Sequence, residues 1–357
     1  MTETVWGNGE PDATVQDLGE LGAGPVLLFG GAYSNLQALQ GLLRHAEALH
    51  IPCSRMIHNG DVIAYCAQPR ETAELLRASG VHCLMGNCEE SVGLSKPDCG
   101  CGFPADSVCN QLSVNWYTHS MNQLRDAPEL RAWMGRLPRR IEFLYGGRRL
   151  GVVHGAPSFI SKFVWPSASE EELLEELARL PHLDGVVCGH SGIPFARLVG
   201  ATASSAETRS KLWLNTGVIG MPANDGTSRG WYAVIDLEDR GSACGAASIR
   251  VNLRCLDYDA AGAAAAIKAE AALNRSYADS LWSGIWPSQQ ILPIEEHMAT
   301  GAPLQEVSFT WHDDARGGDG GEAVRCLVVS PALLFVVVGF AATASALVLL
   351  RRRAARV

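Results

Sequence analysis

The stretch PVLLFGGAYSNLQAL, residues 25–39, decides the fold of this chain. Its apolar half predicts a buried strand, its two adjacent glycines predict a tight turn, and NLQAL predicts the start of a helix. A turn between a strand and a helix often holds an ion or a phosphate, because free backbone N–H groups point out of the helix start. The stretch is the first unit of a domain that we predict over residues 25–258.

Strand and helix patterns alternate after this unit. RMIHNGDVIAY (55–65) predicts a strand and a loop, PRETAELLRAS (69–79) a helix, and VHCLMGNCEE (81–90) a strand that ends in polar residues. IEFLYGGRRLGVVHG (141–155) predicts a hairpin, and Ser169 with Glu172 makes a capping box for the next helix. Alternation of this kind indicates a layered α/β fold.

The chain has 357 residues and a formal net charge of −9, which argues against a general nucleic-acid-binding surface. Residues 1–24 are acidic and lack the apolar core of a secretory signal, so we predict a disordered leader. Residues 259–310 predict a helical and loop extension, and residues 311–325 a polar linker.

Residues 326–350, CLVVSPALLFVVVGFAATASALVLL, contain no charged side chain and are followed by the basic tail RRRAARV, residues 351–357. A run of about 20 apolar residues spans a bilayer as a helix, and core helices are usually shorter. We therefore predict a single-pass, tail-anchored membrane protein. The arginines favour a cytoplasmic C-terminus, whereas the missing signal peptide favours a cytosolic domain, which we prefer. The membrane is not specified.

Polar side chains follow four predicted strands, each beside a glycine: Asp61, Asn87, His154 and His190. One carboxylate, one amide oxygen and two imidazoles suit a borderline cation such as Mn, Fe or Zn. Each residue alone has a plain structural explanation, but four at successive strand ends indicate a site.

These segments, together with GHSGIPF (189–195) and LNTGVIGMPANDGTSRGWYAVID (214–236), resemble the calcineurin-like metallophosphoesterases, especially their small bacterial-type branch. The resemblance covers about residues 25–238 in the order of that family. It implies a four-layer αββα sandwich with two metal ions that share a bridging carboxylate and activate a hydroxide. It also implies that Asp61 bridges, and that Asn87, His154 and His190 complete the second-metal site.

The first-metal site departs from that pattern. Gly31, Tyr33 and Gly192 stand where the resemblance implies Asp, His and His, and Cys88 stands where it implies a catalytic His. The chain is therefore a divergent member in which one divalent ion is expected and a second is doubtful. Tyr33 and Asn35 are candidate groups for substrate contact or for supporting the site.

The sequence has eleven cysteines, which in a reducing compartment are thiols or metal ligands rather than disulfides. Cys88, Cys99, Cys101 and Cys109 lie in or beside a Gly/Cys-rich insertion, residues 91–112. They form a candidate thiol metal site, and Cys88 is a candidate catalytic residue if nearby cations lower its pKa. Packing of small thiols inside a loop is the alternative. Glu89 and Glu90 either replace a ligand or form a solvated loop face, which we prefer.

Three functions remain open. The first is a membrane-anchored, metal-dependent hydrolase of phosphomonoesters or phosphodiesters, with Asp61 and Cys88 as candidate catalytic residues. The second is a non-catalytic binding or regulatory protein that keeps the scaffold and one ion. The third is a cysteine-based metal or redox protein. The expected partners are a small phosphate ester and a membrane, without nucleic acid, and the oligomeric state is not specified.

Overall fold

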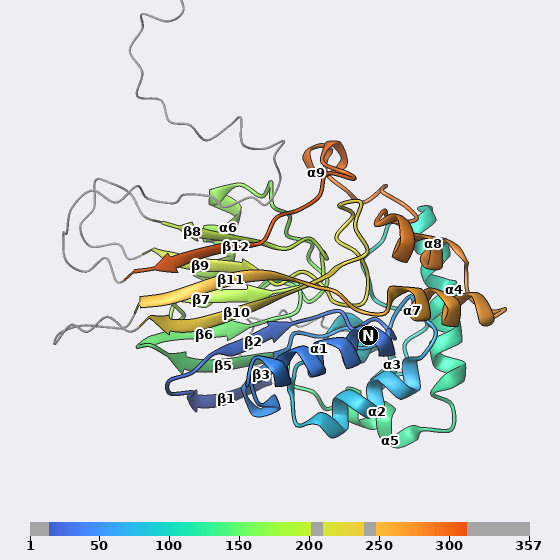
Figure 1. Ribbon diagram of the computed structural model, residues 1–357, viewed down its shortest axis with the longest axis horizontal. Coiled ribbons are helices and arrows are strands. Elements are labelled where there is room, and N and C mark those ends of the chain that lie inside the picture. The colour runs from blue at the N-terminus through green and yellow to red at the C-terminus, as the bar shows by residue number, and fades with distance from the viewer. Residues whose placement is uncertain (1–13, 201–209, 239–247, 313–357) are drawn as a thin grey trace, which may run out of the picture.

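A computed structural model describes residues 14–200, 210–238 and 248–312, which form two β-sheets with helices around them (Figure 1). The predicted α/β class with two packed sheets is confirmed. In order across the sheet, one sheet consists of β1 (Val15–Glu20), β5 (Arg140–Tyr145), β6 (Arg148–Val152), β7 (Gly185–Cys188), β9 (Lys211–Asn215) and β8 (Phe195–Val199). The other consists of β12 (Val307–Trp311), β11 (Ser248–Leu256), β10 (Gly230–Glu238), β2 (Val26–Phe29), β3 (Met56–His58) and β4 (His82–Cys83).

The helices connect these strands and cover their outer faces. They are α1 (Leu36–Ala48), α2 (Pro69–Ser79), α3 (Asn87–Gly93), α4 (Val108–Gln123), α5 (Pro128–Met134), α6 (Glu170–Ala178), α7 (Ala260–Ala269), α8 (Ser276–Ser283) and α9 (Ile294–Met298). Helices α4, α7 and α8 gather at one end of the sheets (Figure 1).

Strand β2 shows why two sheets pack together. Its side chains alternate between the two faces of the sheet, as in any strand. Val26 and Leu28 join an apolar core shared by both sheets, whereas Leu27 and Phe29 join the core beneath the helices. A strand that is buried on both faces reads as a continuous apolar run, which is the VLLF of the opening stretch.

The turn after β2 leads into α1 as predicted. The Asn35 side chain caps α1 by accepting a hydrogen bond of 3.0 Å from the Ala38 backbone N–H. Ser169 caps α6 in the same way, since its hydroxyl accepts from the Glu172 N–H at 3.1 Å. Both contacts satisfy N–H groups that a helix start leaves without partners.

Two domain boundaries need correction. Strand β1 lies inside the predicted disordered leader, where it pairs in parallel with β5 at the edge of its sheet. Strand β12 crosses the predicted boundary between extension and linker, and it pairs with β11. Both are edge strands with mostly exposed or half-buried side chains, so neither carries a clear apolar pattern in the sequence.

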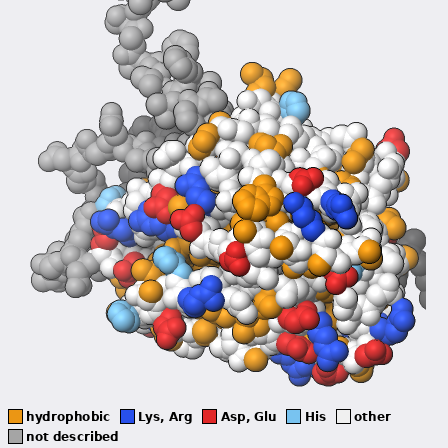
Figure 2. Space-filling view, turned by 45° about the vertical axis from the view of Figure 1, so that its right-hand side comes forward, with side chains coloured by type: hydrophobic (Ala, Val, Ile, Leu, Met, Phe, Trp, Pro, Cys, Tyr) orange, Lys and Arg blue, Asp and Glu red, His pale blue; other side chains and the backbone are white. Residues whose placement is uncertain are grey.

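In the described ranges, 14–200, 210–238 and 248–312, no helix is both long and apolar enough to cross a membrane. The predicted transmembrane helix, residues 326–350, and the basic tail, residues 351–357, lie outside the described residues. Acidic and basic side chains are interspersed on the face that Figure 2 draws. Ion pairs among the described residues include Arg70 with Glu74 at 2.9 Å and Arg254 with Glu306 at 3.4 Å.

Candidate metal centre

The four predicted metal ligands come together at one end of the strands. Asp61 follows β3, Asn87 begins α3 after β4, His154 follows β6, and His190 follows β7. Possible ligand atoms of Asp61, His154 and His190 all lie within 4.8 Å of one another, and all three side chains are buried. The structure therefore contains a possible metal site formed by residues from both sheets.

Distances around His154 define this site. Its Nε2 atom lies 3.0 Å from Asn87 Oδ1, 3.1 Å from His190 Nδ1 and 3.2 Å from Asp61 Oδ2. Its Nδ1 atom lies 2.8 Å from the backbone oxygen of Asn59. A proton on Nδ1 is held by that carbonyl, so Nε2 offers a lone pair, the arrangement that metal-binding histidines commonly use.

With this tautomer, two nitrogen and two oxygen acceptors face one another in a buried space. Lone pairs so close together repel unless a proton or a cation lies between them. The donor set thus fits a cation on chemical grounds, and Asn87 joins the three residues of the possible site.

The same neighbouring groups set the protonation states of His190, Asp61 and His154. Burial and His154 lower the pKa of His190 to about 3, so this imidazole is neutral and can be a ligand. Burial alone would raise the pKa of Asp61, but His154 and His190 lower it, so the carboxylate is ionised. Burial alone would lower the pKa of His154, but Asp61 raises it because its negative charge favours the imidazolium.

The backbone at this site is strained. Asp61 has a φ of 63° and His190 a φ of 59°, a left-handed conformation that non-glycine residues rarely adopt. Such strain persists only where surrounding contacts enforce it, and it is concentrated at functional sites.

Glu89 provides one of these contacts, and it is not the solvated residue that we expected. It is fully buried, and its carboxylate accepts hydrogen bonds from the backbone N–H groups of Asp61 (2.8 Å), Val62 (2.6 Å) and Gly86 (2.7 Å). Burial and Asp61 raise its pKa to about 7, although the backbone donors act in the opposite direction. Glu90 is also buried, and it pairs with Lys96 and Arg139.

Apolar side chains border the positions where the resemblance implies first-metal ligands. Gly31 has a φ of +52°, and a Cβ atom there would lie 2.4 Å from Val218 Cγ1 and 2.8 Å from Tyr33 Cζ. A Cβ atom on Gly192 would lie 3.3 Å from Trp286 Cζ2. The packing of Val218 and Tyr33 therefore excludes a side chain at position 31, and a side chain at position 192 would be in tight contact with Trp286.

The two candidate supporting residues have different surroundings. The Tyr33 ring is buried beside Asp61 in a pocket, and it packs edge-on against Tyr65 at 4.7 Å between ring centres. Burial, with a further contribution from Asp61, raises the pKa of Tyr33 well above its usual value, so its hydroxyl stays protonated. Asn35 instead caps α1 and donates to the Gly220 oxygen at 2.9 Å, which ties the turn to a neighbouring loop.

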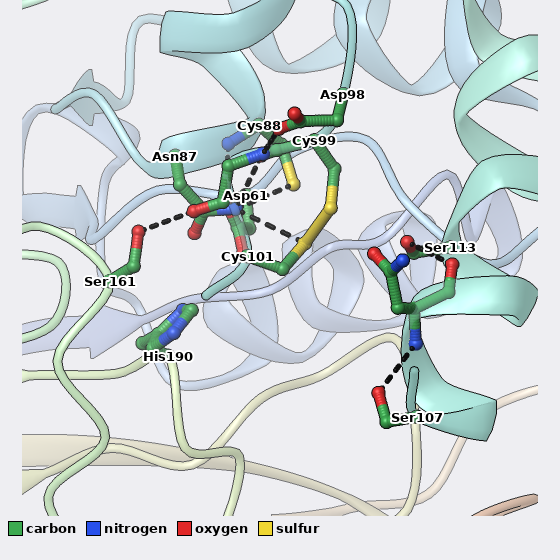
Figure 3. The surroundings of a disulfide bond; sticks show 12 residues. Asp61, Asn87, Cys88, Asp98, Cys99, Cys101, Ser107, Ser113, Ser161 and His190 are labelled. Carbon is green, nitrogen blue, oxygen red and sulfur yellow. Dashed lines mark hydrogen bonds between the residues drawn. A yellow bond between two sulfur atoms is a disulfide. The ribbon is translucent and has the colours of Figure 1, made fainter. Parts of the chain in front are cut away.

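The predicted thiol site needs correction, because Cys99 and Cys101 form a disulfide (Figure 3). A turn at Gly100, with a φ of +64°, places their Cα atoms 5.4 Å apart, a usual separation for a disulfide. The bridge lies beside Asn87, whose Nδ2 atom is 3.4 Å from Cys101 Sγ and 2.9 Å from the Cys99 oxygen. Cys109 is a buried free thiol.

Cys88 has a free, buried thiol 3.5 Å from Asn87 Nδ2. Burial, followed by the negative charges of Asp61 and Glu89, raises its pKa well above the usual value. A nucleophilic thiolate requires a lowered pKa, whereas the surroundings of Cys88 raise the pKa of its thiol. Its backbone N–H donates to Asp61 Oδ1 at 3.2 Å, so the residue also helps to position that carboxylate.

Sequence reasoning missed several residues that shape this site. Glu89 carries a readable signal, because a glutamate three residues after a helix cap commonly bonds back to the cap N–H, here that of Gly86. Asn59 precedes the conspicuous Gly60-Asp61 pair, and it acts through its backbone oxygen, which any residue could supply. Val218 and Trp286 are distant in sequence from the ligands, and no local pattern marks them.

Comparisons with known proteins indicate the family and the fold of this chain. The sequence model of the calcineurin-like phosphoesterase superfamily domain matches residues 34–240. A metallophosphoesterase from Sphaerobacter thermophilus is similar in structure, with a TM-score of 0.52 at 19% identity over 74% of this chain and 100% of that one. A hypothetical protein from Pyrococcus horikoshii OT3 gives a TM-score of 0.56 at 16% identity over 73% and 99%. No curated protein matches the sequence.

Proposed function

This chain belongs to the calcineurin-like phosphoesterase superfamily, and from that premise we propose that it hydrolyses a phosphoric ester with one divalent cation. Asp61, Asn87, His154 and His190 would hold the cation. The observation that carries the proposal is the convergence of their four donor atoms. Asn87 Oδ1, His190 Nδ1 and Asp61 Oδ2 lie 3.0, 3.1 and 3.2 Å from the fourth, His154 Nε2. The family is metal-dependent, and this donor set suits Mn, Fe or Zn.

When bound, such a cation lowers the pKa of a coordinated water and polarises a phosphoryl oxygen. The residues of the chain would prepare the site for it. The Asn59 carbonyl fixes the tautomer of His154, and the Glu89 carboxylate holds the strained loop of Asp61 by three backbone hydrogen bonds. The adjoining pocket, lined by Asp61 and His190, gives an ester access to these groups.

A second cation is not part of this proposal, since Val218, Tyr33 and Trp286 crowd positions 31 and 192. Two-metal sites clamp both the attacking and the leaving oxygen of a displacement. A site with one cation lacks half of this clamp, so we expect slower turnover than in two-metal relatives.

The test is an assay of the full-length chain, loaded with Mn²⁺ or Zn²⁺, on a phosphodiester and a phosphomonoester that release 4-nitrophenol. We expect turnover that disappears in Asp61→Asn and persists in the matched variant Asp126→Asn, whose side chain is exposed. Bound metal without turnover on any ester would refute the hydrolase.

That outcome would favour the alternative, a non-catalytic binding or regulatory protein with one structural ion. The filled first-metal side, at Gly31 and Gly192, is the observation in its favour. The third possibility is a cysteine-based metal or redox protein. Two of its four candidate thiols, those of Cys99 and Cys101, are joined in a disulfide, which argues against it.

Membrane attachment is a separate proposal, which rests on the uncharged run of residues 326–350. We expect the full-length chain to remain in the membrane fraction at alkaline pH, and the chain without residues 326–357 to be released. Release of both forms would overturn it, and cleavage of the domain by a protease added outside intact cells would overturn a cytosolic orientation.

A further inference from the structure

A pocket opens onto the candidate metal centre, where Asp61 and His190 line it. We call it the aromatic pocket because six aromatic side chains contribute to its wall: Tyr33, Tyr65, Phe103, Phe163, Tyr277 and Trp286. Four of these, at positions 65, 103, 163 and 286, are only partly buried, so their rings are accessible. A ligand that reaches the metal centre therefore passes along aromatic surfaces.

Phe163 connects this wall with the metal centre. Its ring centre lies 4.3 Å from that of His190, and it stacks on Trp165 at 5.4 Å with the two planes only 5° apart. Phe103 continues the row, 6.1 Å from Phe163 and nearly parallel to it. The wall thus already contains stacked rings, an arrangement that a planar ligand group can extend.

Two segments without an assigned role build half of this wall. The insertion, residues 91–112, supplies Phe103 and Leu112, and the extension, residues 259–310, supplies Tyr277, Trp286 and Ile291. The extension lies beyond residues 34–240, where the superfamily match ends. Part of the pocket wall therefore comes from outside the residues that match the superfamily.

Hydrogen bonds fix the two segments to each other and to the domain. The Val108 N–H donates to Gln290 Oε1 at 2.8 Å, and the Asn274 N–H donates to Asn115 Oδ1 at 2.8 Å. Trp286 donates its indole N–H to the Pro222 oxygen at 2.7 Å, which fixes its ring against Gly192. These hydrogen bonds tie both segments to the pocket wall, and contacts that preorganise a site lower the cost of binding.

The charge of the pocket limits its ligands. Among the described residues that line it, none is lysine or arginine, and Asp61 adds a negative charge. A phosphomonoester carries up to two negative charges at neutral pH, and a phosphodiester carries one. Each charge that one cation cannot balance would be buried without a partner, which is costly. The lining therefore favours the diester.

We propose that the aromatic pocket binds an aromatic group of a phosphodiester, with Trp286 and Phe163 stacking on that group beside the metal centre. This assignment rests on the proposed phosphoesterase function, and it names the substrate class of the same site. The insertion and the extension thereby become the specificity elements of the chain.

Calorimetric titration of the Mn²⁺-loaded full-length chain tests the proposal by binding, independently of turnover. The probes are diphenyl phosphate, diethyl phosphate, which lacks rings, and phenyl phosphate, which has a ring but a second charge. We expect diphenyl phosphate to bind about fivefold or more tightly than diethyl phosphate, as stacking of one ring implies. It should also bind more tightly than phenyl phosphate, whose second charge one cation leaves unbalanced.

Trp286→Ala should remove this preference for diphenyl over diethyl phosphate, whereas Trp286→Phe, which keeps a ring, should retain most of it. Trp282→Ala is the matched control, because Trp282 is 61% exposed and does not line the pocket. Equal binding of diphenyl and diethyl phosphate, or an unchanged preference in Trp286→Ala, would overturn the proposal even if esters are hydrolysed. If the preference holds but no ester is hydrolysed, the pocket stands and the hydrolase function fails.

Discussion

Replacing Gly31 by alanine tests whether protein atoms have taken the place of the first metal. The new Cβ would lie 2.4 Å from Val218 Cγ1, well inside van der Waals contact. Relief of such a clash requires shifts in a packed core, which cost about 1–3 kcal/mol. The left-handed backbone at Gly31, with a φ of +52°, adds about 1–2 kcal/mol for any side chain. The variant should thus lose about 2–5 kcal/mol of unfolding free energy.

Gly80→Ala isolates the backbone contribution. Gly80 has a φ of +84°, and a Cβ atom there would meet nothing within 4 Å. This variant should lose only the cost of the backbone conformation, about 1–2 kcal/mol. Urea unfolding of both variants, followed by circular dichroism, measures the difference, which we expect to be about 1–3 kcal/mol.

Val218→Ala provides the second arm, because it removes the γ-methyl groups that the new Cβ would meet. In a double-mutant cycle, Gly31→Ala should cost less in the Val218→Ala background than in the original chain. Equal losses in Gly31→Ala and Gly80→Ala, with no coupling to Val218, would refute the claim that this space is filled.

Two further predictions concern carboxylates. Glu89→Gln leaves one oxygen to accept hydrogen bonds from three backbone N–H groups. Affinity for Mn²⁺ or Zn²⁺, measured by competition with a chelator, should therefore fall about 10–100-fold. Unchanged affinity would show that Glu89 does not support the metal site. Burial alone would raise the pKa of Glu142, but hydrogen bonds from His182, Arg149 and Arg140 lower it. Its stabilising effect is therefore complete above the unfolded pKa, about 4.3, and is lost as the pH falls through the lower folded value. Glu142→Gln should cost about 1–2 kcal/mol at pH 7 and flatten the acid side of the stability curve. An acid limb identical to that of the original chain would contradict this.

Local pattern was enough to predict the strand, turn and helix of residues 25–39 and the strand-end positions of Asp61, Asn87, His154 and His190. Strands of this kind are buried on both faces, so their sequence is continuously apolar and easy to recognise. Edge strands β1 and β12 were not predicted, because their side chains are mostly exposed or half-buried. Such strands show little alternation of apolar and polar residues in the sequence.

Contacts between distant segments account for the remaining differences. The burial of Glu89 depends on backbone N–H groups around Asp61 that only the folded loop presents. Trp286 reaches Gly192 across about a quarter of the chain, and nothing near either residue encodes that contact. We predicted Cys99 and Cys101 as free thiols from the number of cysteines and an assumed reducing compartment. Neither consideration takes account of the turn at Gly100, which brings the two residues into a disulfide.

The number of metal ions bound per chain tests the central claim most directly. Native mass spectrometry of the full-length chain, after loading with excess Mn²⁺ or Zn²⁺ and removal of free metal, gives this number. We expect one ion in the original chain and none in the double variant His154→Ala/His190→Ala. Two ions in the original chain, or an ion retained in the double variant, would contradict it.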